Sequence, residues 1–256
     1  QRAVEEALGK SEADVVVHLA AYTNVSEAHK QEGDREGDCY RVNVLGTRNI
    51  ARACASLGKY LIHFSTDFVY DGKKEDLYKE EDFPRSIEWY GTTKLWAEEE
   101  VQSANWQSQS YSILRIAFPF RASFAPKKDL VRTIIAGLSG GNLAPMFTDQ
   151  RITPTFIDDI ARALEGFLRK RPRGIYHVVG STILSPYDLA LKITEIFAFD
   201  RRLVKSGSLE EYSRKDPRPR QRFLGLSNEK LRRDLGMEMG GIEAALKGLE
   251  EQMTSG

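Results

Sequence analysis

Short apolar runs alternate along the chain with longer stretches of mixed polar and apolar residues. The runs are rich in β-branched residues, and each predicts a strand buried on both faces, as in parallel sheets. The longer stretches carry helix end signals, such as a glycine after the last turn or a proline in the first. We expect strands over 14–19, 61–64, 112–118 and 175–179, and helices over 1–8, 39–57, 90–101, 129–138, 157–168, 185–197, 227–235 and 242–253.

Strand and helix alternate through roughly the first two thirds of the sequence. This order predicts an α/β fold in which a parallel sheet carries helices on both faces. Residues 206–221 are basic and contain prolines, which predicts a loop. Residues 1–8 resemble the middle or end of a helix without a start signal, so we expect the chain to begin inside a fold.

The composition narrows the classes of function. The 256 residues are 41% hydrophobic and 29% charged, as in a soluble globular protein with a sizeable core. A net charge of zero and the absence of a long apolar run give no reason to expect nucleic acid or a membrane as partner. Cys39 and Cys54 fall in one predicted helix, so we expect reduced thiols and a cytoplasmic location. His18, His63 and His177 lack metal-ligand spacing, and we expect no metal site.

Tyr90 and Lys94 are four residues apart in the stretch Tyr-Gly-Thr-Thr-Lys. On a helix this spacing places both side chains on one face. A fixed lysine charge beside a tyrosine favours the phenolate and lowers the pKa of the phenol toward the range useful for proton transfer. The competing interpretation is an ordinary amphipathic helix with a solvated lysine, because short motifs have many false positives.

Small polar residues follow a predicted strand at Ser65, Thr66 and Asp67. In open α/β sheets, ligands bind at the carboxyl ends of the strands, so Thr66 is a candidate hydrogen-bond donor to a substrate carbonyl. The same residue types also form capped turns. Asn43, in the middle of a predicted helix, either bonds across to the strand ends or is merely exposed; the sequence leaves both open.

Several stretches together resemble a known family in their order along nearly the whole chain. They are DVVVHLAAYTNV (14–25), VN and GT (42–43 and 46–47), HFSTDFVYDG (63–72), YGTTKL (90–95), DQ and PT (149–150 and 154–155), GIYH (174–177) and RP (218–219). The sequence resembles the extended short-chain dehydrogenase/reductase family, and within it the dTDP-4-dehydrorhamnose reductases. The ordered set overturns the amphipathic-helix interpretation of Tyr90 and Lys94.

The resemblance implies a Rossmann-type doubly wound parallel sheet with a smaller C-terminal substrate domain. The dinucleotide-binding domain would comprise 1–118 and about 151–180, and the substrate domain mainly 119–150 and 181–256. The implied reaction is hydride transfer from NADPH or NADH to the C4 ketone of a dTDP-4-keto-6-deoxy sugar, giving dTDP-L-rhamnose.

The resemblance also implies roles for single residues. Tyr90 would protonate the developing alkoxide, Lys94 would lower the pKa of Tyr90 and bind the nicotinamide ribose, and Thr66 would hydrogen-bond near the reacting oxygen. The implied cofactor contacts are Ala20, Ala21, Tyr22, Thr23, Phe64, Tyr90 and Lys94, and the implied substrate contacts are Thr66, Asp67 and Phe118.

Three departures from the family pattern qualify the resemblance. Its glycine-rich phosphate loop, GxxGxxG, is absent, so we expect the N-terminal βαβ unit to lie upstream of Gln1. Phe118 stands where the family usually has a tryptophan near the sugar. The next residues, Pro119-Phe120-Arg121, also differ from the family pattern.

Three functions on this fold are compatible with the sequence, and the first is the sugar-nucleotide reductase described above. The related sugar-nucleotide dehydratases carry an Asp-Glu pair after the threonine, whereas here Phe68 follows Asp67, which favours reduction over elimination. The regulatory subunit of methionine adenosyltransferase also resembles this sequence, so a non-catalytic subunit is one alternative. A nucleotide-sugar epimerase is another. The sequence leaves open whether the cofactor is NADH or NADPH, whether the chain forms a homodimer, and whether a magnesium ion lies at a subunit contact. Arg218-Pro219-Arg220 is either a diphosphate contact or a basic loop.

Overall fold

The computed structural model describes residues 1–105, 110–123 and 128–254. Its centre is a four-stranded sheet in the order β1-β2-β3-β8, with every neighbouring pair parallel. The predicted α/β class and the parallel sheet are therefore confirmed. The strands are β1 (Val15–His18), β2 (Tyr60–Thr66), β3 (Tyr111–Ile116) and β8 (Gly174–His177).

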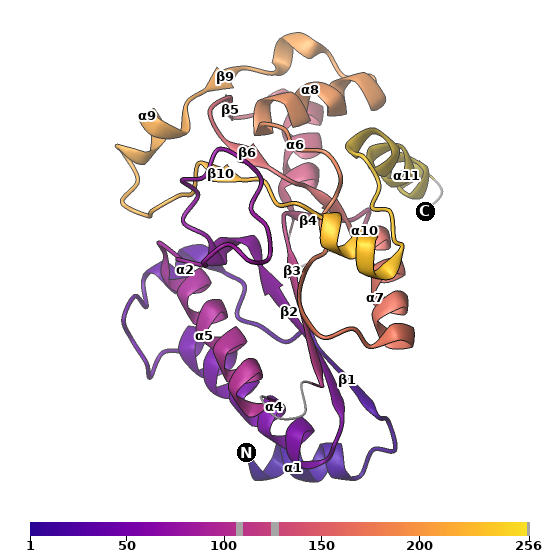
Figure 1. Ribbon diagram of the computed structural model, residues 1–256. Coiled ribbons are helices and arrows are strands. Elements are labelled where there is room, and N and C mark those ends of the chain that lie inside the picture. The colour runs from indigo at the N-terminus through magenta and orange to yellow at the C-terminus, as the bar shows by residue number, and fades with distance from the viewer. Residues whose placement is uncertain (106–109, 124–127, 255–256) are drawn as a thin grey trace.

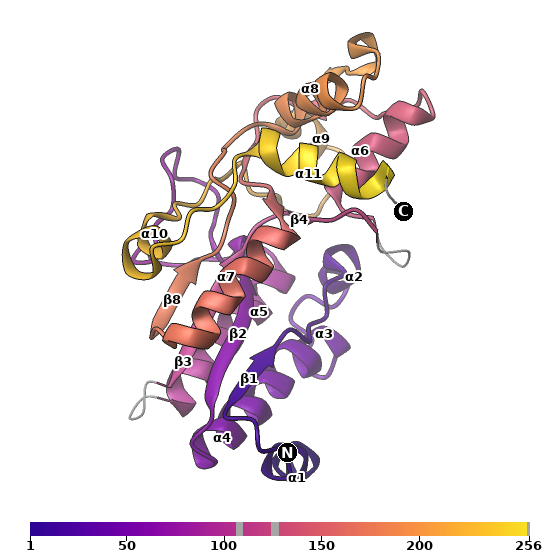
Figure 2. The ribbon, with the colours of Figure 1, turned by 90° about the vertical axis from the view of Figure 1, so that its right-hand side faces the viewer.

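Helices cover both faces of this sheet, as Figure 2 shows. Alternate residues of β2 point to opposite faces, and all seven are buried. Tyr60, Ile62 and Phe64 pack against α7 (Ile157–Lys170) and α10 (Glu229–Leu235). Leu61 packs against α4 (Thr47–Ser56) and α5 (Trp89–Ala104), and α1 (Arg2–Gly9) lies against α4.

A second hydrophobic core lies above the carboxyl ends of the strands in Figure 1. It is built by α6 (Leu130–Ser139), α8 (Pro186–Ile196) and α11 (Ile242–Thr254). Three two-stranded parallel pairs accompany these two parts. They are β4 (Pro119–Phe120) with β7 (Thr155–Phe156), β5 (Met146–Phe147) with β9 (Ser206–Gly207), and β6 (Arg151–Ile152) with β10 (Phe223–Leu224).

Two predicted segments differ in detail. The helix expected over 39–57 is α3 (Asp38–Tyr40), the π-helical turn η1 (Arg41–Gly46) and α4. The loop expected over 206–221 contains β9 and α9 (Leu209–Ser213), because the Asp149 carboxylate accepts hydrogen bonds from the Leu209 N–H at 2.7 Å and the Ser208 hydroxyl at 2.8 Å. The remaining short helices are α2 (Val25–His29), η2 (Asp67–Val69) and η3 (Arg201–Leu203).

Asn43 lies in the π-helical turn and is fully buried. Its Oδ1 accepts a hydrogen bond from the Tyr22 N–H at 2.8 Å, and its Nδ2 donates to the Thr93 hydroxyl at 3.0 Å. The side chain therefore ties the loop after β1 to α5, which answers the question that the sequence left open. π-Helical turns often occur near functional sites, where they redirect a side chain in this way.

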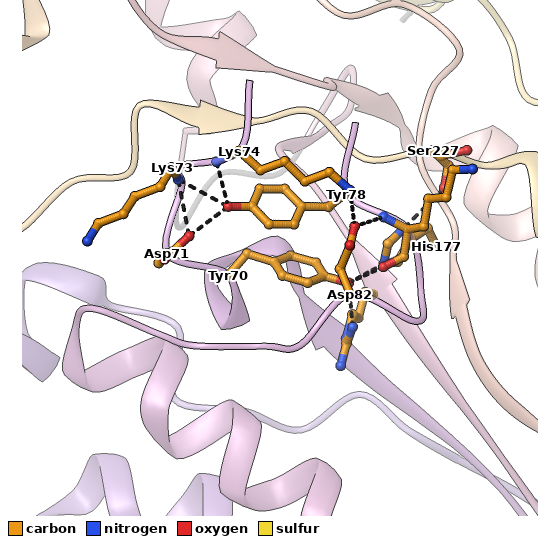
Figure 3. Close-up of polar contacts among 10 residues, drawn as sticks. Tyr70, Asp71, Lys73, Lys74, Tyr78, Asp82, His177 and Ser227 are labelled. Atoms are coloured by element: carbon orange, nitrogen blue, oxygen red, sulfur yellow. Dashed lines mark hydrogen bonds and ion pairs between the residues drawn. The ribbon is translucent and has the colours of Figure 1, made fainter. Parts of the chain in front are cut away.

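The loop after η2 is anchored by stacked aromatic rings (Figure 3). The rings of Tyr70 and Tyr78 are 4.2 Å apart, and the Tyr78 hydroxyl donates to the Asp71 carboxylate at 2.7 Å. The Tyr70 hydroxyl lies 2.9 Å from Nε2 of His177, whose Nδ1 faces the Ser227 carbonyl at 3.1 Å. These contacts bind the loop to β8 and to the segment before α10.

A buried ion pair joins α5 to β3 next to this loop. Arg115 donates from Nε and Nη2 to the two carboxylate oxygens of Glu98, at 3.0 and 2.6 Å, and both side chains are at most 1% exposed. Arg115 Nη1 donates to Tyr70, and the Ser65 hydroxyl donates to Glu98 at 2.5 Å. Breaking such a pair is costly because the remaining charge stays buried without compensation.

Replacing Glu98 with glutamine is expected to lower the free energy of unfolding by about 3–5 kcal/mol, because the Arg115 charge loses its partner. Urea denaturation of the two proteins measures the difference. Glu100→Gln is the matched control on the same helix. Glu100 pairs with Arg48 at 2.7 Å with both side chains partly exposed, so the expected loss is at most about 1 kcal/mol. Equal losses in the two variants would contradict the expectation.

Candidate active site

A cavity of about 390 Å³ opens at the carboxyl ends of β2 and β3, beside the first turn of α5. This is the edge of a parallel sheet where ligands bind in open α/β folds. Its lining comes from the loop after β1, the end of β2, the start of α5 and the segment from β3 to α6. The lining residues are Thr23, Val25, Ser65, Thr66, Asp67, Phe68, Tyr90, Ile116, Phe118, Pro119, Arg121, Lys128, Asp129 and Leu130.

Glu88 and Gly91 set the position of α5 at this cavity. The Glu88 carboxylate caps the helix by accepting the N–H groups of Gly91 at 2.6 Å and Tyr90 at 3.1 Å. A Cβ atom at position 91 would collide with the carbonyl oxygen of Phe68, so only glycine allows this approach. The helix therefore starts directly against the end of β2, with Tyr90 beside Thr66 and Asp67.

The phenol of Tyr90 is partly buried at the wall of the cavity. Burial raises its pKa, and the nearby Asp67 carboxylate raises it further, while a hydrogen bond with the Thr66 side chain acts in the opposite direction. The sequence predicts that Lys94 lowers this pKa. Lys94 is not among the groups that shift this pKa, and its ammonium donates to the Phe64 carbonyl, so its effect on Tyr90 stays a prediction.

Lys94 lies one turn further along α5 and is almost fully buried. Its Nζ donates to the Phe64 carbonyl at 2.7 Å and lies 3.4 Å from Nε2 of His63. Because an ammonium only donates, this contact makes Nε2 the acceptor and assigns the ring proton to Nδ1. Burial lowers the pKa of Lys94 to about 8, and the Glu98 carboxylate partly opposes this.

Thr66 and Asp67 form a hydrogen-bonded pair at the end of β2. The Thr66 hydroxyl donates to Oδ1 of Asp67 at 2.9 Å and accepts the Phe68 N–H at 3.3 Å. Asp67 is 1% exposed, and its Oδ2 has no hydrogen-bond partner among the described residues. Burial raises the pKa of Asp67 to about 7, although bonds from Thr66 and from backbone N–H groups favour the carboxylate.

The structure gathers part of the predicted site at the cavity. Five of the predicted residues line it: Thr23, Thr66, Asp67, Tyr90 and Phe118. Five others do not: Ala20, Ala21, Tyr22, Phe64 and Lys94. The two alanines lie in the loop after β1, the Tyr22 ring packs beside Trp89 of α5, and Phe64 is buried against α7.

Sequence reasoning missed the wall contributed by Ile116, Pro119, Arg121, Lys128 and Leu130. Phe118, between β3 and β4, has φ 41°, in the left-handed region that non-glycine residues rarely adopt. The backbone therefore turns sharply at Phe118, and the alternation of polar and apolar residues in the sequence does not reveal such a turn. The departure of 119–121 from the family pattern was the available signal.

A second cavity of about 310 Å³ adjoins the first, since Phe68, Phe118 and Leu130 line both. Arg218 and Arg220 line its far part. Arg220 pairs with Asp216 at 2.7 Å and lies over the Tyr212 ring at 4.6 Å. Two arginines of the basic tripeptide that the sequence singled out thus line a cavity that adjoins the Tyr90 site.

Metal and membrane features were searched for over the described ranges. Within them, no group of three or more His, Cys, Asp and Glu side chains is arranged to hold a metal ion. None of the helices seen there combines the length and apolar character needed to cross a bilayer. Cys39 and Cys54 are both buried and unbonded to each other.

Comparisons with known proteins agree with the geometry. The family described as RmlD substrate binding domain matches residues 1–255. The probable low-salt glycan biosynthesis reductase Agl14 of Haloferax volcanii is 31% identical over 250 residues, covering 96% of this chain and 80% of that protein. The dTDP-4-dehydrorhamnose reductase of Mycobacterium tuberculosis is 30% identical over 222 residues, covering 84% and 69%.

A solved structure matches over most of its length as well. The dTDP-4-dehydrorhamnose reductase of Bacillus anthracis, determined in complex with NADP, superposes with a TM-score of 0.87 at 25% identity, covering 97% of this chain and 84% of that one. The full-length family match and the similarity to Agl14 establish the relationship. The chain belongs to the RmlD substrate binding domain family of extended short-chain dehydrogenases/reductases.

Proposed function

We propose that this protein is an NAD(P)H-dependent sugar-nucleotide reductase that reduces the C4 ketone of a dTDP-4-keto-6-deoxy sugar to give dTDP-L-rhamnose, in the cytoplasm. The observation that carries the proposal is the placement of Tyr90, Thr66 and Asp67 on one cavity, with the Lys94 ammonium buried one turn away. The Tyr90 hydroxyl gives its proton to the carbonyl oxygen as hydride reaches C4. Relatives named as reductases support the reaction class.

The residues next to the cavity suit a reduced nicotinamide, which supplies the hydride. Among the described residues, the Phe64 carbonyl and Nε2 of His63 accept hydrogen bonds from two of the three ammonium hydrogens of Lys94. The third hydrogen can be donated to a hydroxyl of the cofactor ribose. Ala20, Ala21, Tyr22 and Thr23 would contact the cofactor from the loop after β1. The alanines allow close approach of a ligand to the backbone.

The substrate would occupy the two adjoining cavities. Thr66, Asp67 and Phe118 would contact the sugar, and the guanidinium groups of Arg218 and Arg220 match a diphosphate. Residues 119–150 and 181–256 would then form most of the substrate domain, and 1–118 with about 151–180 the dinucleotide-binding domain. Phe68 stands where elimination needs a second carboxylate, which supports simple reduction.

Tyr90→Phe is expected to reduce kcat about 10²–10⁴-fold, because phenylalanine keeps the ring but cannot donate the proton. The measurement is NADPH or NADH oxidation by full-length protein with dTDP-4-keto-6-deoxyglucose and the 3,5-epimerase. Tyr111→Phe is the matched control, since Tyr111 begins β3, at the end of the strand away from the cavity. Turnover that survives Tyr90→Phe would remove the assigned proton donor. Tight binding of another protein without turnover would favour a non-catalytic subunit.

Cofactor affinity is expected to depend on the charge of Lys94. Its pKa is lowered to about 8, so the ammonium dominates below this pH and is lost above it. The Kd for NADPH or NADH, measured by fluorescence titration without substrate, should therefore rise as the pH passes through about 8. Lys94→Met should bind about 10–100-fold more weakly at pH 7, the equivalent of one charged hydrogen bond, and should lose the pH dependence. A Kd in wild-type protein that is flat between pH 7 and 9 would contradict this role.

A further inference from the structure

Once Tyr90 has given up its proton, it needs another before the next turnover. The structure places a hydroxyl and an acid beside the phenol, because Tyr90, Thr66 and Asp67 line one cavity. The Thr66 hydroxyl donates to Oδ1 of Asp67 at 2.9 Å, and the Thr66 side chain also favours the phenolate form of Tyr90. The acid, Asp67, and the group it would protonate, Tyr90, therefore line the same cavity.

We propose that Asp67 is the internal acid that returns a proton to Tyr90 through the Thr66 hydroxyl. This role rests on the proposed reduction. It makes Asp67 a proton-transfer residue in addition to the sugar contact implied by the resemblance.

The proton steps balance. While Asp67 is a carboxylate, the Thr66 hydroxyl donates to it. When Asp67 is protonated this bond reverses, so the carboxyl donates its proton to Oγ1 of Thr66 while the Thr66 hydroxyl turns and passes its own proton to the Tyr90 phenolate. Thr66 ends unchanged, Tyr90 is a neutral phenol again, and Asp67 is a carboxylate. Water entering the open cavity after product release supplies the proton that restores the acid. The hydride transfer itself is not altered.

A capping role alone does not account for Asp67. Thr66 already caps η2, because its oxygen accepts the Phe68 N–H. The second carboxylate oxygen of Asp67 is buried and has no hydrogen-bond partner among the described residues. Burying an ionised carboxylate with an unsatisfied oxygen is costly, whereas the protonated acid avoids much of this cost. The position therefore favours a group that carries a proton near neutral pH.

Burial and the nearest carboxylate both favour the protonated form of Asp67. Burial raises its pKa to about 7, and the Glu88 carboxylate at the start of α5 adds to the rise. Tyr90 faces it from the same helix. Arg121, Lys128 and Asp129 also line the cavity, where the two cations favour the carboxylate and Asp129 opposes it. A pKa near the working pH allows the acid to give its proton and to recover it.

Asp67→Asn is the first test, because asparagine keeps the size and removes the acid. At saturating substrate and pH 6, kcat should fall about tenfold or more relative to wild type. The ratio should approach one as the pH rises well above 7, where wild-type Asp67 has lost its proton. Using kcat separates this effect from a loss of sugar binding, which changes KM. A ratio that is constant from pH 6 to pH 9 would overturn the proposal.

Glu88→Gln is the matched control, since burial also raises the pKa of Glu88 to about 7 while its oxygens bind helix N–H groups. This variant should keep the fall of kcat above pH 7. If that fall disappears in Glu88→Gln and remains in Asp67→Asn, Glu88 is the titrating group and the proposal is wrong.

A second test needs no turnover. Carbon-13 NMR of aspartate carboxyl groups in the unliganded protein, with Asp67→Asn for assignment, should place the pKa of Asp67 near 7. Thr66→Val should raise that pKa, because the Thr66 hydrogen bond stabilises the carboxylate, and Thr66→Ser should restore it. A pKa near 4, or no response to Thr66→Val, would overturn the proposal. If the pKa and its response are as expected but no nicotinamide is oxidised, the coupled pair is present and the reductase assignment fails.

Discussion

The contact between the first turn of α5 and the chain leaving β2 is the constraint on which the site depends. Gly91 has no side chain to hold the helix away from the Phe68 carbonyl, and the Glu88 carboxylate caps the exposed N–H groups at that end. Helix and strand end therefore meet at backbone distance. This contact brings the Tyr90 phenol of the helix and the Thr66–Asp67 pair of the strand end to a single cavity.

The same packing removes water from several ionisable groups, and this sets their chemistry. Lys94 and Asp67 are both buried, yet neither forms an ion pair with an opposite charge in the described part of the chain. Desolvation then moves the pKa of each toward neutrality, downward for the ammonium and upward for the carboxyl. Glu98 and Arg115, in contrast, neutralise each other at 2.6 Å and serve to hold α5 on β3. Burial therefore has two different consequences around α5: the paired charges of Glu98 and Arg115 support the fold, whereas the unpaired Lys94 and Asp67 are poised for binding and proton transfer.

The site also depends on how two hydrophobic cores are placed. One core holds the sheet between α4 and α5 on one face and α7 and α10 on the other, and the second core groups α6, α8 and α11 above the strand ends. The cavities lie where these parts meet, with Phe118 and Leu130 on one side and the Tyr90 helix on the other. A ligand bridging the cavities would contact both parts. This arrangement suits a large two-part substrate.

The local pattern of apolar and polar residues was sufficient to predict much of the fold. Apolar β-branched runs predicted the four strands of the sheet, because strands covered on both faces carry such continuous runs. The four-residue spacing of Tyr90 and Lys94 determined that both lie on one face of a helix. The pattern did not determine the pKa of Tyr90, because that value depends on burial and on Asp67, which is distant in sequence from the helix. Nor did it determine the role of Asn43, or the wall formed by Arg121 and Lys128. These are set by contacts between segments far apart along the chain, and only the packed tertiary structure decides which buried groups find a partner.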